Sequence, residues 1–233
     1  MTCGGIPAVP SGFAGVPSLV RQLCSLPILN AIISMTYKEE FLTLLRSTGR
    51  DGLEDVITKM EELGFFIAPA STKYHLNYEG GLLEHSVKVC RAALKLREAF
   101  IDLNPSLAER LPRESVIIAA LLHDVCKAEI YKPVTKKEKN TQGIWVETQG
   151  YAIDDTQLPL GHGEKSVVEL VSWGLMLTRD EQLAIRWHMG AWDLAMESTS
   201  MKASFGRAQE STPLVTILIS ADNMSSYLLE DRD

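Results

Sequence analysis

The residues best suited to metal binding or catalysis are histidines and aspartates that fall at predicted helices or helix ends. Asp124 directly follows His123, and Asp222 interrupts the apolar face of the last predicted helix. Neutral imidazole combined with carboxylate suits Mn, Fe, Zn, Co or Ni better than Ca or Mg. A shared site for divalent transition-metal ions explains the whole set better than independent core residues do. The set consists of His85, His123, Asp124, His162, His188 and Asp222.

Part of this pattern also has a simpler explanation. A buried carboxylate needs a cation or several hydrogen-bond donors. Lys127, three residues after Asp124, could supply that cation in a plain ion pair. Each histidine alone is also compatible with an ordinary core position. Metal binding is therefore favoured by the set as a whole and not by any single member.

Composition limits the classes of protein to consider. The 233 residues are 45% hydrophobic, enough to bury a sizeable core in one or two domains. The net charge of −7 disfavours a surface that coats nucleic acid generally. Four cysteines without a CxxC motif predict reduced thiols and a cytoplasmic protein. No apolar stretch reaches the roughly 18–20 residues of a membrane span.

Hydrophobic periodicity predicts an all-α fold for most of the chain. The segment 114–126 is apolar nearly all round, which is typical of a buried central helix. The helical rhythm breaks at 131–160, where short β-like runs at 144–146 and 151–153 flank a turn at Gln149–Gly150. We therefore expect a small hairpin inserted into a helical domain. Helices are predicted at 37–47, 52–63, 82–100, 114–126, 163–172, 179–188 and 213–229.

The first residues differ from the remainder. Residues 1–34 are rich in Pro and Gly, and Arg21 is their only charged side chain. They are either a flexible or loosely docked arm or a segment that precedes a natural start at Met35. We expect them to lack a catalytic role. Residues 35–233 are expected to form one helical domain that contains the hairpin.

The ordered pattern H…HD…H…H…D, with its flanking residues, resembles the HD-domain superfamily of metal-dependent phosphohydrolases. The likeness covers about residue 35 to the C-terminus and extends to small HD proteins of bacteria and phages. The first matching segment is also similar to the HD domain of bacterial 3′–5′ exoribonucleases. The matching segments are GGLLEHS at 80–86, ALLHDVCK at 120–127, GHGE at 161–164, WH at 187–188 and AD at 221–222.

The resemblance implies a dinuclear metal centre. His85, His123, Asp124 and Asp222 would form the first site, and His162 and His188 would complete the second, with Asp124 bridging. Lys127 matches the lysine of the HDxxK form, which usually contacts a substrate phosphate or another anion.

Such a centre has a clear chemical use. A bound divalent ion lowers the pKa of its water from 15.7 toward about 7, and a pair of ions also clamps phosphoryl oxygens. If one helix continues through His123 and Asp124, their side chains diverge by about 100°, so the carboxylate reaches a second ion. Lys127 would then share the face of His123 and neutralise charge on a phosphoryl transition state.

Further residues are candidates for substrate contact. Glu84 either orients a metal ligand or is a solvated helix residue. His75 either faces the substrate as a donor or general acid, or is structural. The span 127–139 carries five basic and two acidic residues, so Lys132 and its neighbours form either a basic rim or a solvated loop. Trp145 could stack a base beside that rim.

The sequence thus predicts a metal-dependent phosphohydrolase. We expect a phosphodiesterase or nucleotidase that acts on nucleotides or nucleic-acid 3′ ends, with Asp124, Lys127 and His75 as catalytic residues. The alternative is an HD-type di-iron oxygenase of a small organic substrate, because such members share the ligand pattern. A non-catalytic nucleotide sensor is disfavoured because the ligand set is complete. Substrate identity and oligomeric state stay open.

Overall fold

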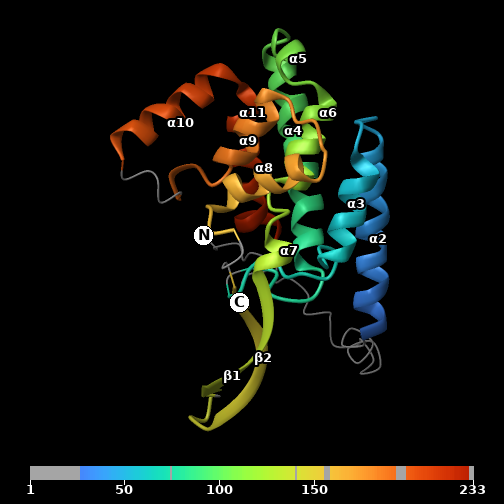
Figure 1. Ribbon diagram of the computed structural model, residues 1–233, viewed down its shortest axis with the longest axis vertical. Helices are drawn as coiled ribbons and strands as arrows, with labels where there is room; N and C mark the ends of the chain where they lie inside the picture. The colour runs from blue at the N-terminus through green and yellow to red at the C-terminus, as the bar shows by residue number, and fades with distance from the viewer. Residues whose placement is uncertain (1–26, 74, 140, 155–157, 193–197, 231–233) are drawn as a thin grey trace, which may run out of the picture.

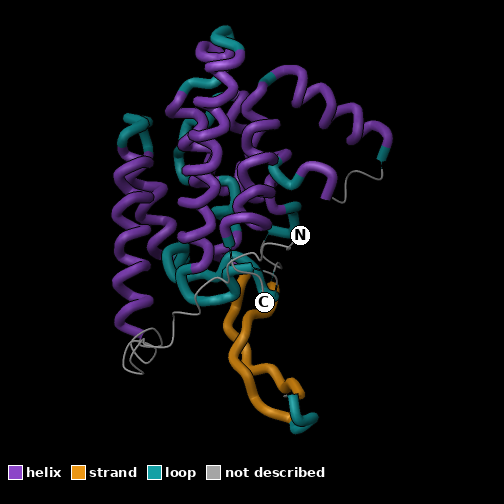
Figure 2. Tube along the Cα trace, turned by 180° about the vertical axis from the view of Figure 1, so that it is seen from behind, coloured by secondary structure: helices purple, strands orange, loops and turns teal. Residues whose placement is uncertain are grey.

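The computed structural model describes residues 27–73, 75–139, 141–154, 158–192 and 198–230. Helices pack into a body from which one β-hairpin projects, as Figures 1 and 2 show. The all-α fold with a small hairpin is therefore confirmed. The elements are α2 (Pro27–Arg46), α3 (Leu53–Glu62), α4 (Gly81–Leu103), α5 (Leu107–Arg110), α6 (Arg113–Leu122), α7 (Lys127–Ile130), β1 (Tyr131–Lys139), β2 (Trp145–Ile153), α8 (His162–Ser172), α9 (Arg179–Trp187), the 3₁₀ turn η1 (Gly190–Trp192), α10 (Thr199–Ser211), α11 (Pro213–Met224) and the π-helical turn η3 (Ser225–Leu229).

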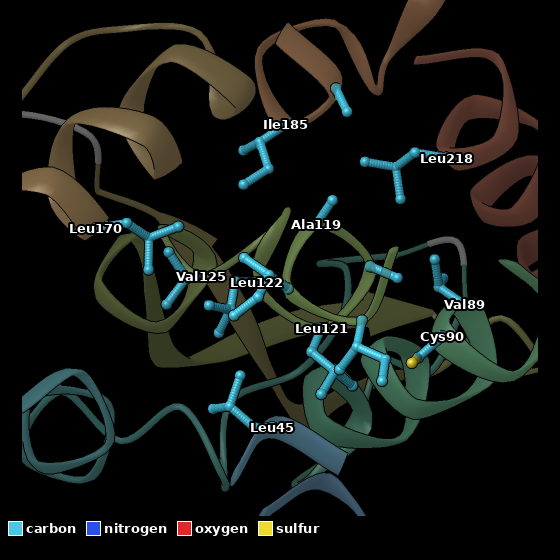
Figure 3. Close-up of a cluster of buried hydrophobic side chains, with 14 of the residues drawn as sticks. Leu45, Val89, Cys90, Ala119, Leu121, Leu122, Val125, Leu170, Ile185 and Leu218 are labelled. Atoms are coloured by element: carbon cyan, nitrogen blue, oxygen red, sulfur yellow. The ribbon is translucent and has the colours of Figure 1, made fainter. Parts of the chain in front are cut away.

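Helix α6 lies at the centre of the body, as its apolar sequence predicts. Every residue from Ser115 to Leu122 is buried. It packs against α2, α4, α9 and α11, and Figure 3 shows Leu121 and Leu122 among side chains of the surrounding helices. Because α6 is enclosed on all sides, the residues that directly follow it emerge inside the protein.

The hairpin exists, but its expected turn was wrong. The runs 144–146 and 151–153 do not pair with each other. Strand β2 contains Trp145, Val146 and all of 151–153, and it pairs antiparallel with β1. Gly150 lies opposite Val134 in mid-strand and not in a turn. The sequence of β1, rich in lysine and almost without apolar alternation, resembles a solvated loop. Backbone pairing with β2 forms the strand despite that sequence.

Other boundaries moved in ways that matter for function. The α-helix of α6 ends at Leu122, so His123 to Cys126 form a turn and not the continuous helix that the sequence predicted. The last helix stops at Met224, and the π-helical turn η3 replaces its expected final turns. Helix α10 was missed because its spaced apolar residues, Met201, Phe205 and Ala208, stand among Ser, Thr and Gly.

The N-terminal boundary also differs from the expectation. Helix α2 begins at Pro27, inside the segment that the sequence assigned to an extension. Residues 1–26 of that extension lie outside the described residues. Within the described chain, no helix is both long and apolar enough to cross a membrane.

A buried ion pair joins the loop after α2 to the start of α9. The carboxylate of Glu181 is fully buried and accepts two hydrogen bonds from the Arg50 guanidinium, at 2.7 and 2.8 Å. Arg50 also donates to the Met176 carbonyl at 2.7 Å. Glu181 further completes a capping box with Thr178. The pair therefore fixes the beginning of the helix whose end carries His188.

We expect Arg50→Ala to destabilise the protein by about 2–4 kcal/mol, because it leaves a buried carboxylate without its cation. Arg46→Ala is the matched control, since Arg46 forms a similar pair with Glu54 on the exposed surface. Because both members of that pair are exposed to solvent, its loss should change stability much less than the loss of Arg50 does. Urea unfolding of both variants measures the difference. Equal losses would show that burial of Glu181 does not matter.

Candidate metal centre

Four segments that are far apart in sequence bring together atoms that could ligate a metal ion. His85 comes from α4, His123 and Asp124 from the turn after α6, His188 from the end of α9, and Asp222 from α11. The Nε2 atom of His85 lies 3.3 Å from Asp222 Oδ1 and 3.3 Å from His123 Nε2.

Asp124 connects two of the histidines. Its Oδ2 lies 3.3 Å from His123 Nε2, and its Oδ1 lies 3.4 Å from His188 Nε2. Ligand atoms about 2.0–2.2 Å from one ion at tetrahedral angles are themselves roughly 3.3–3.6 Å apart. The spacing of these side chains therefore suits a metal ion.

A hydrogen-bond acceptor at Nδ1 orients each of the three imidazoles in the cluster. His123 Nδ1 donates to the Ala120 carbonyl at 2.9 Å, and His188 Nδ1 donates to the Ile185 carbonyl at 2.8 Å. His85 Nδ1 contacts Glu230 Oε1 at 2.8 Å. Acceptors at Nδ1 leave Nε2 of each ring facing the cluster, which is the arrangement that supports a metal-ligating histidine.

Asp124 Oδ1 and His188 Nε2 are buried and lie 3.4 Å apart, but neither makes a well-formed hydrogen bond to a described residue. Buried polar atoms are costly unless they bond well, so the chemistry of this pair fits a bound metal ion. The described residues contain three overlapping groups that could hold a metal ion, and they are His75–His85–Glu230, His85–His123–Asp124 and His123–His188–Asp222.

Asp124 is also paired with Lys127, at 2.6 Å between Oδ2 and Nζ. Burial alone would raise the pKa of Asp124, but Lys127 and the neighbouring histidines outweigh it and hold that pKa well below its usual range. Burial opposes the charge of Lys127 too, yet Asp124 raises the pKa of the lysine. The simple ion pair is thus present, and it coexists with a carboxylate oxygen that is left for another ligand.

Glu230 is a functional candidate that the sequence did not reveal. Its side chain is fully buried and joins two imidazoles, with Oε1 at His85 Nδ1 and Oε2 in contact with His75 Nδ1. In the sequence it belongs to an acidic C-terminal run, which is typical of a solvated end. The π-helical turn η3 carries it back to the cluster, and turns of this kind are frequent at functional sites.

Several other candidates lie elsewhere. His162 begins α8, and its ring lies 4.0 Å from Cys126 Sγ. None of the metal-binding groups within the described chain includes it. Glu84 accepts a hydrogen bond from Tyr78 and pairs with Lys88, and its side chain is 16% exposed. These contacts are neither with a candidate metal ligand nor with open solvent, so both alternatives for Glu84 stay predictions. Lys132 and Trp145 are exposed on the hairpin, with Lys139 over the Trp145 ring.

A cavity of about 590 Å³ opens beside the cluster. One part of its wall is charged and consists of His75, His85, Asp124, Lys127, His188 and Asp222. The other part is mainly apolar and aromatic and consists of Met189, Trp192, Ile219, Asn223, Ser226 and Tyr227. Small-molecule sites commonly have about this volume and this mixture of a few polar groups with apolar walls.

Comparisons with known proteins cover part of this site. Residues 52–152 match a family named TraI_2, described as a putative helicase. Over 102 residues the chain is 36% identical to the dihydroneopterin 2′,3′-cyclic phosphate phosphodiesterase of Methanocaldococcus jannaschii. The aligned residues make up 44% of this chain and 36% of that relative. The match thus spans about a third of the relative's length. No solved structure matches the chain.

We expect Glu230→Gln to weaken metal binding about 10- to 100-fold, because a neutral amide holds the His85 ring less firmly. Glu84→Gln is the control, since Glu84 directly precedes His85 but bonds to Tyr78 and Lys88. Competition of each variant with a chelating dye for Zn²⁺ gives the affinities. The same affinity in Glu230→Gln as in the unmodified protein would contradict this role.

Metal binding should also release a proton from His85. Burial lowers the pKa of His85, but Asp222 and Glu230 outweigh it and raise that pKa to about 9. Below that pH the metal-free ring is charged, so an ion must displace the Nε2 proton. Affinity should therefore rise about tenfold per pH unit toward pH 9, if one proton is displaced per ion. Calorimetry in buffers of different ionisation enthalpy counts the proton, and pH-independent binding would refute the assignment.

Proposed function

We propose that the chain is an HD-type metal-dependent phosphodiesterase that acts on a nucleotide or a related phosphate ester. The observation that carries this proposal is the set of three buried imidazoles whose Nδ1 atoms are held by acceptors while their Nε2 atoms face shared carboxylates. Histidine and carboxylate ligands suit transition metals that activate water. The proposed domain covers residues 35–233 together with the first turns of α2 from Pro27, and its ligands come from α4 to α11.

The proposal includes two ions. His85, His123, Asp124 and Asp222 would hold the first, and His188 and His162 would complete the second, with Asp124 shared. The contact between α8 and α9 supports a role for His162, because a Cβ at Gly163 would lie 2.3 Å from the Arg186 carbonyl oxygen. The N-terminal end of α8 therefore packs closely against the last turn of α9, directly before His188.

The side chains of this chain suit hydrolysis of a phosphodiester. Bound metal would supply activated water and charge neutralisation. Lys127 is held beside Asp124 and lines the cavity, so its ammonium can bind a non-bridging oxygen of the substrate phosphate. His75 lines the same cavity with its Nδ1 held by Glu230, which orients its ring for contact with the substrate.

The partial relative supports the reaction class. That protein is named as a phosphodiesterase of a cyclic phosphate, and the match is too short to bring its substrate to this chain. The family match spans His85, His123, Asp124 and Lys127 but not the later ligands. The proposal therefore takes only phosphodiester hydrolysis from the comparison.

We expect hydrolysis of bis-para-nitrophenyl phosphate and of nucleotides with Mn²⁺. His123→Ala and Asp124→Ala should abolish turnover, whereas Lys127→Ala should raise KM about tenfold or more, because a charge-assisted contact is lost. Asp55→Ala, on the exposed side of α3, is the control and should leave turnover unchanged.

The same experiment can reject the proposal. Metal analysis of anaerobically purified protein accompanies the assay. Iron with a mixed-valence signal and no hydrolysis would favour an oxygenase. Full activity in Asp124→Ala would reject the metal centre itself.

A further inference from the structure

The apolar part of the cavity wall contains an aromatic side chain that is not buried in the protein core. Trp192 lines the cavity and is 74% exposed, the highest exposure of any aromatic residue in the described chain. Tyr227, 54% exposed, lines the same cavity. A tryptophan side chain offers a large apolar surface, and its burial is strongly favourable. Exposure beside a cavity therefore indicates a surface for a ligand.

The backbone turn that carries Trp192 packs against the helical body. The 3₁₀ turn η1 begins two residues after His188, and the Trp192 amide donates to the Met189 carbonyl at 3.1 Å. Gly190 adopts a positive φ of 53° and is buried. A Cβ there would lie 3.3 Å from Ile219 Cγ2, so the turn packs closely on α11. The packing of Gly190 on α11 thus places the backbone of Trp192 at the cavity wall.

The two parts of the wall suit two parts of one molecule. Lys127 is the single lysine or arginine among the described residues that line the cavity, and it stands beside the metal-ligating carboxylates. The aromatic part adds Asn223 and Ser226, whose polar groups can bond to the edge of a ring. A volume of about 590 Å³ suits a mononucleotide-sized ligand and not a long strand.

We propose that Trp192, which lines the cavity together with Tyr227, is the platform that binds a planar heterocyclic ring of the substrate while its phosphate lies at Lys127 and the metal centre. This inference rests on the proposed function and names its substrate class, a phosphate ester that carries an aromatic base. The base can come from a free nucleotide or from the end of a strand. The structure thereby assigns to Trp192 the stacking role that the sequence suggested for Trp145, which lies on the projecting hairpin and outside the cavity lining.

The test compares two ligands that differ only in the base. Calorimetry with Mn²⁺ present measures binding of adenosine 5′-monophosphate and of ribose 5-phosphate. The intact chain should prefer the nucleotide about tenfold or more. Trp192→Ala should weaken nucleotide binding about fivefold to a hundredfold and leave ribose 5-phosphate unchanged. Trp192→Phe should retain most of the preference because it keeps an aromatic face.

Trp145→Ala is the matched control, since this tryptophan is 65% exposed but distant in the fold. It should change neither affinity. Equal binding of the two ligands by the intact chain, or a loss of preference in Trp145→Ala alone, would overturn the platform. A triadenylate separates the two sources of the base. Trp192-dependent binding tighter than that of the mononucleotide indicates a strand end, and weaker binding indicates a free nucleotide.

These measurements need no turnover, so they are independent of the proposed reaction. A Trp192-dependent preference without hydrolysis would keep the subsite and reject the phosphodiesterase. Hydrolysis without any preference for the base would keep the phosphodiesterase and reject the subsite.

Discussion

The carboxylate of Asp124 is buried in the turn that follows the central helix α6, and the surrounding structure depends on compensating its charge. Its side chain is 2% exposed. Lys127 contacts one oxygen, and His123 and His188 approach from the same turn and from α9. A charge in such a place is tolerated only when several partners converge on it. The packing of α4, α9 and α11 around α6 brings those partners to one point.

Sequence reasoning succeeded where a signal repeats along the chain. The apolar content of 114–126 indicated the central helix, and the histidines and aspartates at helix ends indicated a common site. The structure brings His85, His123, Asp124, His188 and Asp222 together. His162 stays a prediction, because its described contacts are with Cys126.

The remaining features depend on geometry that single residue types do not encode. Glu230 contacts His85 from the position directly after the π-helical turn η3, a segment for which the sequence predicted regular helix. The pairing of β1 with β2 comes from backbone hydrogen bonding between strands, and a lysine-rich segment gives little sign of it. Trp192 follows His188 by four residues, yet its place on the cavity wall depends on the packing of Gly190 against Ile219.

The projecting hairpin has a consequence for solubility. Figure 1 shows β1 and β2 extending beyond the helical body, and the described sheet has two strands, so each has an outer edge without a neighbouring strand. Open edges invite pairing with another copy of the same strand, and lysine and proline are the residues that most often prevent it. Lys132, Pro133, Lys136, Lys137 and Lys139 lie along β1. Protection of this strand edge against pairing between molecules is therefore enough to explain the lysines of β1, whatever binds in the cavity.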